Sequence, residues 1–159
     1  MRLYFAYGSN MSQAQMRRRC PGAQIIGAAR LDDWRFAINV RGTATILPAT
    51  HHSVHGVLWR LRPAHLATLD GFEGVSRRRY VRRTVRVVRA DGTPFPAVAY
   101  VGVQFGRGRA IRAYLEGTIL PAAQHFALPE DYVRGLRDAA GGTMLGPVRP
   151  HPRRRGWRP

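Results

Sequence analysis

The sequence predicts an α+β fold with a mostly antiparallel, curved sheet. Short β-rich segments separated by turn residues fill the chain up to about residue 103, and segments with helical spacing come mainly after them. A doubly wound nucleotide-binding fold is not expected, because no GxGxxG motif follows a strand and no GxxxxGK[ST] motif is present. At 159 residues the chain has the length of one ordinary domain.

The N-terminal region is expected to run from strand to turn to helix. Residues 2–7 are typical of a strand that ends at Gly8-Ser9-Asn10. Ser12 is placed to cap a short helix that stops before Pro21. Several short strands should follow, and the candidates are 24–29, 34–39, 43–47 and 54–61.

The middle of the chain is expected to hold one helix and one β-hairpin. Pro63 suits the first position of a helix that runs to about Asp70. A strand over 80–88 then reaches Asp91-Gly92, which is a strong hairpin signal, and pairs with a strand over 97–103.

Helices are expected toward the end of the domain. Residues 110–120 have helical spacing, and Pro121 should break or kink this segment. Pro129 opens a last helix that Gly141-Gly142 ends. We expect the domain to cover 1–146. The Arg- and Pro-rich tail, 147–159, has no apolar periodicity and is expected to be flexible.

The composition predicts a cytoplasmic protein without a membrane partner. No run of 18 or more apolar residues is present, and polar turn residues come too early for a signal peptide. The single cysteine, Cys20, cannot form an internal disulfide, which fits a reducing compartment.

The charge is strongly basic. There are 26 basic residues against 9 acidic ones, a net charge of +17, and every basic residue is Arg. Such a balance fits nucleic acid, an acidic small substrate or a compositional bias of the source genome. The lack of Lys favours bias, so we do not expect nucleic acid to be the main partner.

Three positions are candidates for chemistry. The turn at Gly8-Ser9-Asn10 follows a strand, so its backbone N–H groups can hold a carboxylate or an oxyanion, or it is a plain strand-to-helix turn. Glu73 lies in an apolar stretch that raises the pKa of its carboxyl toward an acid–base range, unless it is a solvated loop carboxylate paired with a neighbouring Arg. Tyr80 can bond Glu73 or a substrate carboxylate, or it is a cross-strand aromatic.

The histidines do not predict a metal site. His51, His52 and His55 form an HHxxH pattern, but no cysteine or carboxylate stands close by in the sequence to complete a ligand set. We therefore expect neither a metal nor another cofactor.

Together these motifs resemble the γ-glutamyl cyclotransferases. The opening YFAYGSNM looks like the N-terminal signature of that family, and the match continues through GVLW at 56–59 and LDGFEGV at 69–75. Tyr80 follows Glu73 by seven residues, and AYV occupies 99–101. The resemblance covers roughly residues 3–138.

The resemblance implies a small mixed, mostly antiparallel β-barrel flanked by helices. It also implies a reaction in which a γ-glutamyl amide cyclises and releases 5-oxoproline and a free amine. Glu73 takes the position of the catalytic Glu, and Tyr80 that of a substrate-contacting Tyr. The remaining implied substrate-binding residues are Tyr7, Gly8 and Ser9, with Tyr4 and Asn10 beside them.

This chain departs from the family pattern at Phe105, where some members have a Tyr. The difference implies the loss of one hydroxyl contact and bears on the leaving-group preference. The partner implied by the resemblance is a small-molecule γ-glutamyl substrate. The alternatives are a non-catalytic binding module on the same fold and an Arg-rich nucleic-acid-binding protein. Neither the leaving amine nor the oligomeric state follows from the sequence.

Overall fold

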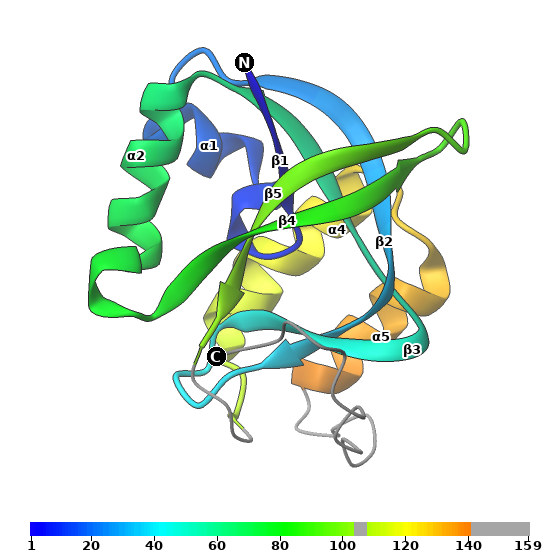
Figure 1. Cartoon of the computed structure of the whole chain (residues 1–159). Coiled ribbons are helices and arrows are strands. Elements are labelled where there is room, and N and C mark those ends of the chain that lie inside the picture. Colours follow the sequence, from blue (N-terminus) through cyan, green and yellow to red (C-terminus); the bar gives the residue numbers. More distant parts are fainter. Residues whose placement is uncertain (104–107, 141–159) are drawn as a thin grey trace.

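Five strands close into a barrel in the order β1-β3-β2-β4-β5 (Figure 1). The computed structural model describes residues 1–103 and 108–140, so Phe105, Gly141-Gly142 and the tail 147–159 lie outside the described residues. The strands are β1 (Arg2–Ala6), β2 (Gln24–Ile38), β3 (Ala44–Leu61), β4 (Tyr80–Arg89) and β5 (Pro94–Gly102). A single parallel pair, Tyr4 with Val98, joins β1 to β5, and the other pairings are antiparallel. The predicted fold class is therefore confirmed.

The expectation of four short strands in the first half of the chain is wrong, because they form two long ones. β2 and β3 pair along almost their whole lengths, with a register shift between Asp32 and Trp34. Asp33 and His51 both have φ of 62°, an unusual conformation for residues other than glycine. These polar positions look like loops in the sequence, but they are irregular points at which a strand pair bends without ending.

The β4–β5 hairpin follows the prediction. Gly92 has φ of 80° in the turn, a value that glycine adopts without steric cost. The register runs from Tyr80 opposite Gly102 to Val88 opposite Pro94. Tyr80 therefore starts β4 at the end of the hairpin far from its turn.

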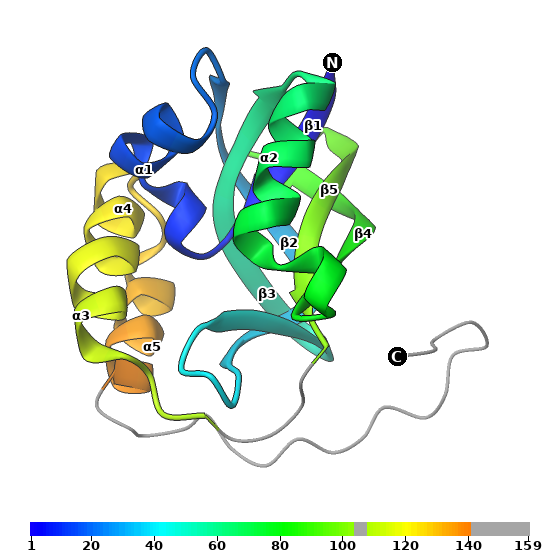
Figure 2. The ribbon, with the colours of Figure 1, turned by 90° about the vertical axis from the view of Figure 1, so that its left-hand side faces the viewer.

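The helices lie on two parts of the barrel surface. Figure 2 shows α1, α3, α4 and α5 along one side and α2 against the strands, and α1 also contacts α2. The α-helices are α1 (Gln13–Arg19), α2 (Pro63–Glu73), α3 (Arg112–Tyr114), α4 (Leu120–His125) and α5 (Glu130–Ala140). The 3₁₀ helices are η1 (Ser9–Met11) and η2 (Val75–Arg77), and η3 (Leu115–Ile119) is a π-helical turn. None of the helices within 1–103 and 108–140 is long and apolar enough to cross a membrane.

Two helix signals in the sequence have clear structural outcomes. The Ser12 hydroxyl accepts from the backbone N–H of Gln15 at 3.3 Å, so Ser12 caps α1 as predicted. Pro121 does not interrupt the helical path, since α4 continues through it. The turn immediately before it widens into η3, which is one way a helix accommodates a residue without an N–H donor.

Candidate functional site

The YGSN turn, Tyr7 to Asn10, directly follows the end of β1. Tyr7 is buried directly after β1, and η1 then buries Asn10 and Met11. The backbone N–H of Met11 donates to the Gly8 oxygen at 2.9 Å, which closes the tight turn. A Cβ on Gly8 would lie 3.2 Å from both the Ala44 side chain and the Tyr114 hydroxyl, so there is little room for any larger residue here.

Glu73 is the last residue of α2. Gly74 ends the helix in the left-handed conformation, with φ of 65°, and its N–H bonds to the Asp70 and Gly71 oxygens. The helix is thus about one turn longer than predicted, and Glu73 sits on an ordered final turn. Its Oε1 accepts a hydrogen bond from Asn10 Nδ2 at 3.0 Å, which brings the two sequence motifs together.

Asn10 is the hub of the site. Its Nδ2 donates to Glu73 and to the Tyr4 phenol oxygen, the latter at 2.9 Å. Its Oδ1 accepts from Gln15 Nε2 at 3.0 Å and from Arg19 Nη1 at 2.8 Å. Every donor and acceptor position of this buried amide is therefore used.

The electrostatic setting raises the proton affinity of the Glu73 carboxyl. Burial raises the pKa of its carboxyl above the ordinary value, while the Arg19 charge and the Asn10 hydrogen bond lower it in part. Burial also raises the pKa of Tyr4 and of Tyr7 well above the usual value, and the Glu73 charge adds to both shifts. These phenols stay neutral, and Tyr7 donates to the backbone oxygen of Tyr100.

Tyr80 lies within electrostatic range of Glu73 but is hydrogen-bonded elsewhere. Its hydroxyl donates to the Ala44 oxygen at 2.7 Å and accepts from Asn39 Nδ2 at 3.0 Å. Thr43 Oγ1 also lies 3.0 Å from it. Burial is the main cause that raises the pKa of Tyr80 to about 12. Within the described residues no hydrogen bond joins this phenol to Glu73, so its substrate contact stays a prediction.

Tyr114 was not singled out from the sequence as a site residue, yet its hydroxyl reaches the YGSN turn. The backbone N–H groups of Ala44 and Ser9 and the Ser9 hydroxyl face the phenol oxygen, and burial raises its pKa. The only sequence signal was the helical spacing of 110–120, which assigns Tyr114 to a packed face. Arg19 was missed for a similar reason, since a run of three Arg is typical of a solvated face.

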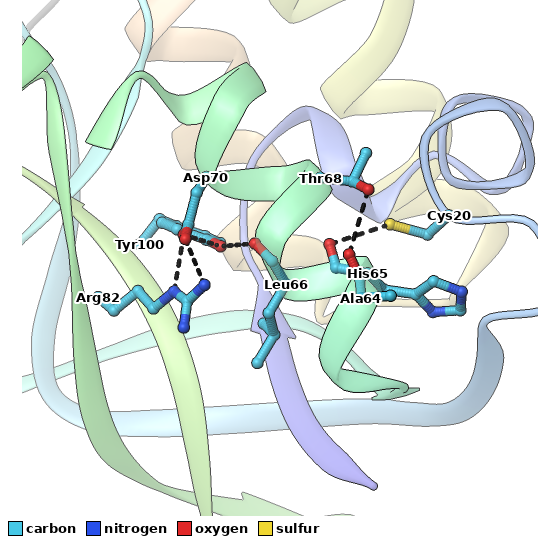
Figure 3. A network of polar contacts seen from close by, with 8 residues as sticks. All are labelled: Cys20, Ala64, His65, Leu66, Thr68, Asp70, Arg82 and Tyr100. Carbon is cyan, nitrogen blue, oxygen red and sulfur yellow. Dashed lines mark hydrogen bonds and ion pairs between the residues drawn. The ribbon is translucent and has the colours of Figure 1, made fainter. Parts of the chain in front are cut away.

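Within LDGFEGV, the residues from Asp70 to Gly74 form a D-x-x-E-G motif, and its first residue, Asp70, anchors α2 to the sheet (Figure 3). Its carboxylate accepts from the Tyr100 hydroxyl at 2.8 Å and forms a bidentate ion pair with Arg82. The Tyr100 hydroxyl also lies 3.2 Å from the Leu66 oxygen. These contacts tie the helix that ends in Glu73 to β4 and β5.

The profile of the AIG2-like family matches residues 53–136, just over half of the chain. This chain belongs to the AIG2-like family. The matched region includes the D-x-x-E-G motif, Tyr80 and the strands that Tyr80 and Tyr100 occupy.

Several relatives of this AIG2-like chain are named as γ-glutamyl cyclotransferases, the family that its motifs resemble. The human γ-glutamylcyclotransferase is 29% identical over 156 residues, which cover 92% of this chain and 82% of the relative. A solved structure named γ-glutamyl cyclotransferase is 29% identical, covers 86% of each chain and superposes with a TM-score of 0.80. An uncharacterized human protein of known structure is 28% identical, with 93% coverage of each chain and a TM-score of 0.81. The predicted resemblance is confirmed, and the chain is a γ-glutamyl cyclotransferase-like enzyme.

The histidine pattern does not assemble into a ligand set in this AIG2-like chain. His51 and His52 are exposed on β3, and the His55 ring packs against Tyr132 with 5.0 Å between centroids. Across 1–103 and 108–140, no three His, Cys, Asp or Glu side chains are grouped so that they could hold a metal ion. Cys20 is buried, and its thiol faces the His65 oxygen at 3.7 Å.

Proposed function

We propose that this enzyme cyclises γ-glutamyl amides. The α-amine of the glutamyl group attacks its own γ-carbonyl carbon, the new C–N bond closes a five-membered ring, and the original amide C–N bond breaks. The products are 5-oxoproline and a free amine. The hydrogen bond between Asn10 and Glu73 is the main support for this proposal. Through it, a carboxyl group of raised pKa at the end of α2 lies against the turn that follows β1.

Glu73 is the acid–base group in this proposal. As a carboxylate it removes one proton from the α-ammonium, and as a carboxylic acid it returns that proton to the leaving nitrogen as the amide C–N bond breaks. The ring nitrogen still carries one extra proton, which the regenerated carboxylate takes up and passes to the released amine, so that the amine leaves as its ammonium ion. One carboxyl can serve both steps when burial brings its pKa toward the working pH. The nucleophile belongs to the substrate, so the protein supplies no nucleophilic side chain.

The YGSN turn and the nearby phenols hold the substrate in this proposal. Backbone N–H groups of Gly8, Ser9 and Asn10 face the glutamyl group and the oxyanion that develops on the γ-carbonyl. The Tyr114 hydroxyl, which meets the Ser9 N–H in the free enzyme, is placed to donate to the same oxygen. Tyr4 and Tyr7 line the site, and Tyr80 contacts the glutamyl end.

Much of the rate enhancement would come from orientation. A well-oriented intramolecular attack reaches effective molarities on the order of 10⁵ M or more. The pocket therefore has to select the folded conformer of the glutamyl group and exclude the extended one. The proposed route needs proton transfer and oxyanion stabilisation, and it includes no metal or cofactor.

The proposed substrate is a γ-glutamyl amino acid or a γ-glutamyl-capped metabolite of the cytoplasm. The test is 5-oxoproline release from a panel of such compounds that differ only in the leaving amine. We expect turnover of at least one compound by the wild type, and a loss of roughly 10²–10⁴-fold in Glu73→Gln. Binding without release throughout the panel would instead identify a non-catalytic binding module.

A further inference from the structure

Arg19 differs from the two arginines beside it. All three lie in the last turn of α1, where positive charge is favourable at the helix C-terminus. Arg17 and Arg18 are exposed, whereas Arg19 is partly buried. A helix-end role explains why the run is basic, but it does not explain why one guanidinium turns toward the site.

The first contact of Arg19 fixes the orientation of the Asn10 amide. Arg19 Nη1 donates to Asn10 Oδ1 at 2.8 Å, and Gln15 Nε2 donates to the same oxygen at 3.0 Å. A guanidinium can donate hydrogen bonds but cannot accept them. If the amide turned over, its NH₂ group would face the guanidinium and its oxygen would face the Glu73 carboxylate, and both contacts would be repulsive. Arg19 therefore keeps the Asn10 NH₂ group directed at Glu73 and Tyr4.

The second contact of Arg19 is with the residue beside Glu73. The central carbon of its guanidinium lies 4.3 Å from the centroid of the Phe72 ring, in the geometry of a cation–π interaction. Phe72 is 56% exposed, so burial in the core does not fix its ring. Since Phe72 directly precedes Glu73, one guanidinium touches both the η1 turn and the last turn of α2.

We propose that Arg19 is a positioning residue that holds Asn10 and the final turn of α2 in register, so that the Asn10 amide stays hydrogen-bonded to Glu73. This inference rests on the proposed function, in which Glu73 is the acid–base group. Arg19 acts through its contacts with Asn10 and Phe72.

The charge of Arg19 adds an effect on titration. It lowers the pKa of Glu73 against the larger opposing effect of burial. Four neutral phenols also lie near the Glu73 carboxyl, and the negative charge of Glu73 raises the pKa of each. They are Tyr4, Tyr7, Tyr80 and Tyr114. The Arg79 side chain packs near Gly74, the residue after Glu73. Loss of Arg19 should therefore move the titration of Glu73 to higher pH.

The experiment compares Arg19→Met with Arg18→Met, which removes the same charge from the same helix turn. We expect Arg19→Met to lower kcat roughly ten- to a hundredfold with a smaller change in KM, because it weakens a hydrogen bond to a charged group. The acidic limb of the kcat/KM profile should move to higher pH. Arg19→Lys keeps the charge and should leave the limb in place, with kcat only partly restored. Arg18→Met should match the wild type in each respect.

A double variant tests whether Arg19 acts through Asn10. In an Asn10→Ala background, Arg19→Met should lower kcat much less than it does in the wild type. Equal losses in the two backgrounds would overturn the proposal, as would Arg19→Met kinetics identical to those of Arg18→Met. If Arg19→Met fails to fold, the effect of Arg19→Lys on kcat is compared in the wild-type and Asn10→Ala backgrounds instead, and equal losses would again overturn the proposal.

A measurement without turnover separates this proposal from the proposed function. The Glu73 carboxyl carbon can be titrated by NMR, with Glu73→Gln used to assign its signal. Arg19→Met should shift that titration to higher pH, and Arg18→Met should not. Absence of 5-oxoproline release by the wild type would count against the proposed function alone, whereas an unshifted Glu73 titration would count against Arg19.

Discussion

The Nδ2 atom of Asn10 lies 3.0 Å from Oε1 of Glu73, although the two residues are 63 positions apart in the sequence. This contact links a turn that depends on β1 to a helix end that depends on α2. Anything that moves either element should therefore alter the same hydrogen bond.

We expect Glu73→Gln to fold normally and to lose activity by roughly 10²–10⁴-fold, which is the usual contribution of general acid–base catalysis. Gln keeps the side-chain shape and an oxygen that can still accept from Asn10, but it cannot carry the proton. Release of 5-oxoproline and a melting curve measure the two effects. Glu116→Gln is the matched control, because Glu116 is exposed and pairs with Arg112 within its own helical segment. Full turnover by a well-folded Glu73→Gln protein would remove Glu73 from the mechanism.

The raised pKa of Glu73 predicts a dependence of both activity and stability on pH. Activity that requires the carboxylate should fall as pH drops through a pKa above the ordinary Glu value of about 4.3. The sign for stability is opposite to that of a salt-bridged carboxylate. The folded state holds this proton more tightly than the unfolded state, so stability decreases as pH rises from the unfolded pKa to the folded one. Glu73→Gln should therefore gain in melting temperature relative to wild type across that interval, and an unchanged difference would contradict the raised pKa.

The sequence was a reliable guide where a residue acts locally. Ser12 caps α1, Gly92 forms the hairpin turn and Pro63 opens α2, because each of these depends on the chemistry of a few neighbouring residues. The strands predicted in the regions of β2 and β3 are too short. Asp33 and His51 are residue types common in turns, but here they lie at bends within paired strands. Only the sheet partner decides between those two structures.

The sequence predicted the individual motifs of the candidate site but not the hydrogen bonds that join them. The YGSN turn and Glu73 could be found as motifs, whereas the hydrogen bond through Asn10 requires the barrel and α2 to be placed together. Tyr114 and Arg19 gave no distinct signal, because a helical periodicity and an Arg run have common structural explanations. Their proximity to the site follows from tertiary packing alone.

Tyr80→Phe should separate a substrate contact from a structural one. Loss of the hydroxyl removes the donor to the Ala44 oxygen and a partner of Asn39, so we expect a loss of stability of about 1 kcal/mol. If the phenol also contacts the glutamyl end, kcat/KM should fall roughly ten- to a hundredfold. Thr43→Val is the comparison, since it removes another partner of the phenol and keeps the phenol itself. A lowered melting temperature with unchanged kcat/KM in Tyr80→Phe would restrict Tyr80 to the structural role.

Asp70→Ala should loosen α2 and lower activity without touching the reacting groups. It removes both the Tyr100 hydrogen bond and the Arg82 ion pair. The ion pair is partly exposed and should contribute at most about 1 kcal/mol, so Arg82→Gln should have a small effect. The buried Tyr100 hydroxyl should account for most of the loss, roughly 1–3 kcal/mol. Urea unfolding of Asp70→Ala and Arg82→Gln measures this difference, and equal losses would assign the anchor to the ion pair.

Gly56→Ala should disturb the site through the backbone of β1. A Cβ at Gly56 would lie 2.2 Å from the Ala6 oxygen, which is closer than real contacts come, and 3.0 Å from the Phe5 ring. Because the Ala6 oxygen belongs to a paired strand, β1 itself has to shift, and Tyr7 and the YGSN turn follow directly from it. We expect a loss of about 1–3 kcal/mol in the free energy of unfolding, as for other overpacked cores, together with reduced 5-oxoproline release.

Gly71→Ala provides the opposite expectation within the same protein. A Cβ at Gly71 meets nothing within 4 Å, and the residue lies inside α2. Alanine is favoured over glycine in a helix by about 0.8–1.0 kcal/mol, so this variant should melt at a higher temperature than the wild type. If Gly56→Ala were as stable as Gly71→Ala and equally active, β1 would have to tolerate displacement. The turn that β1 carries could then not depend on its close packing against β3.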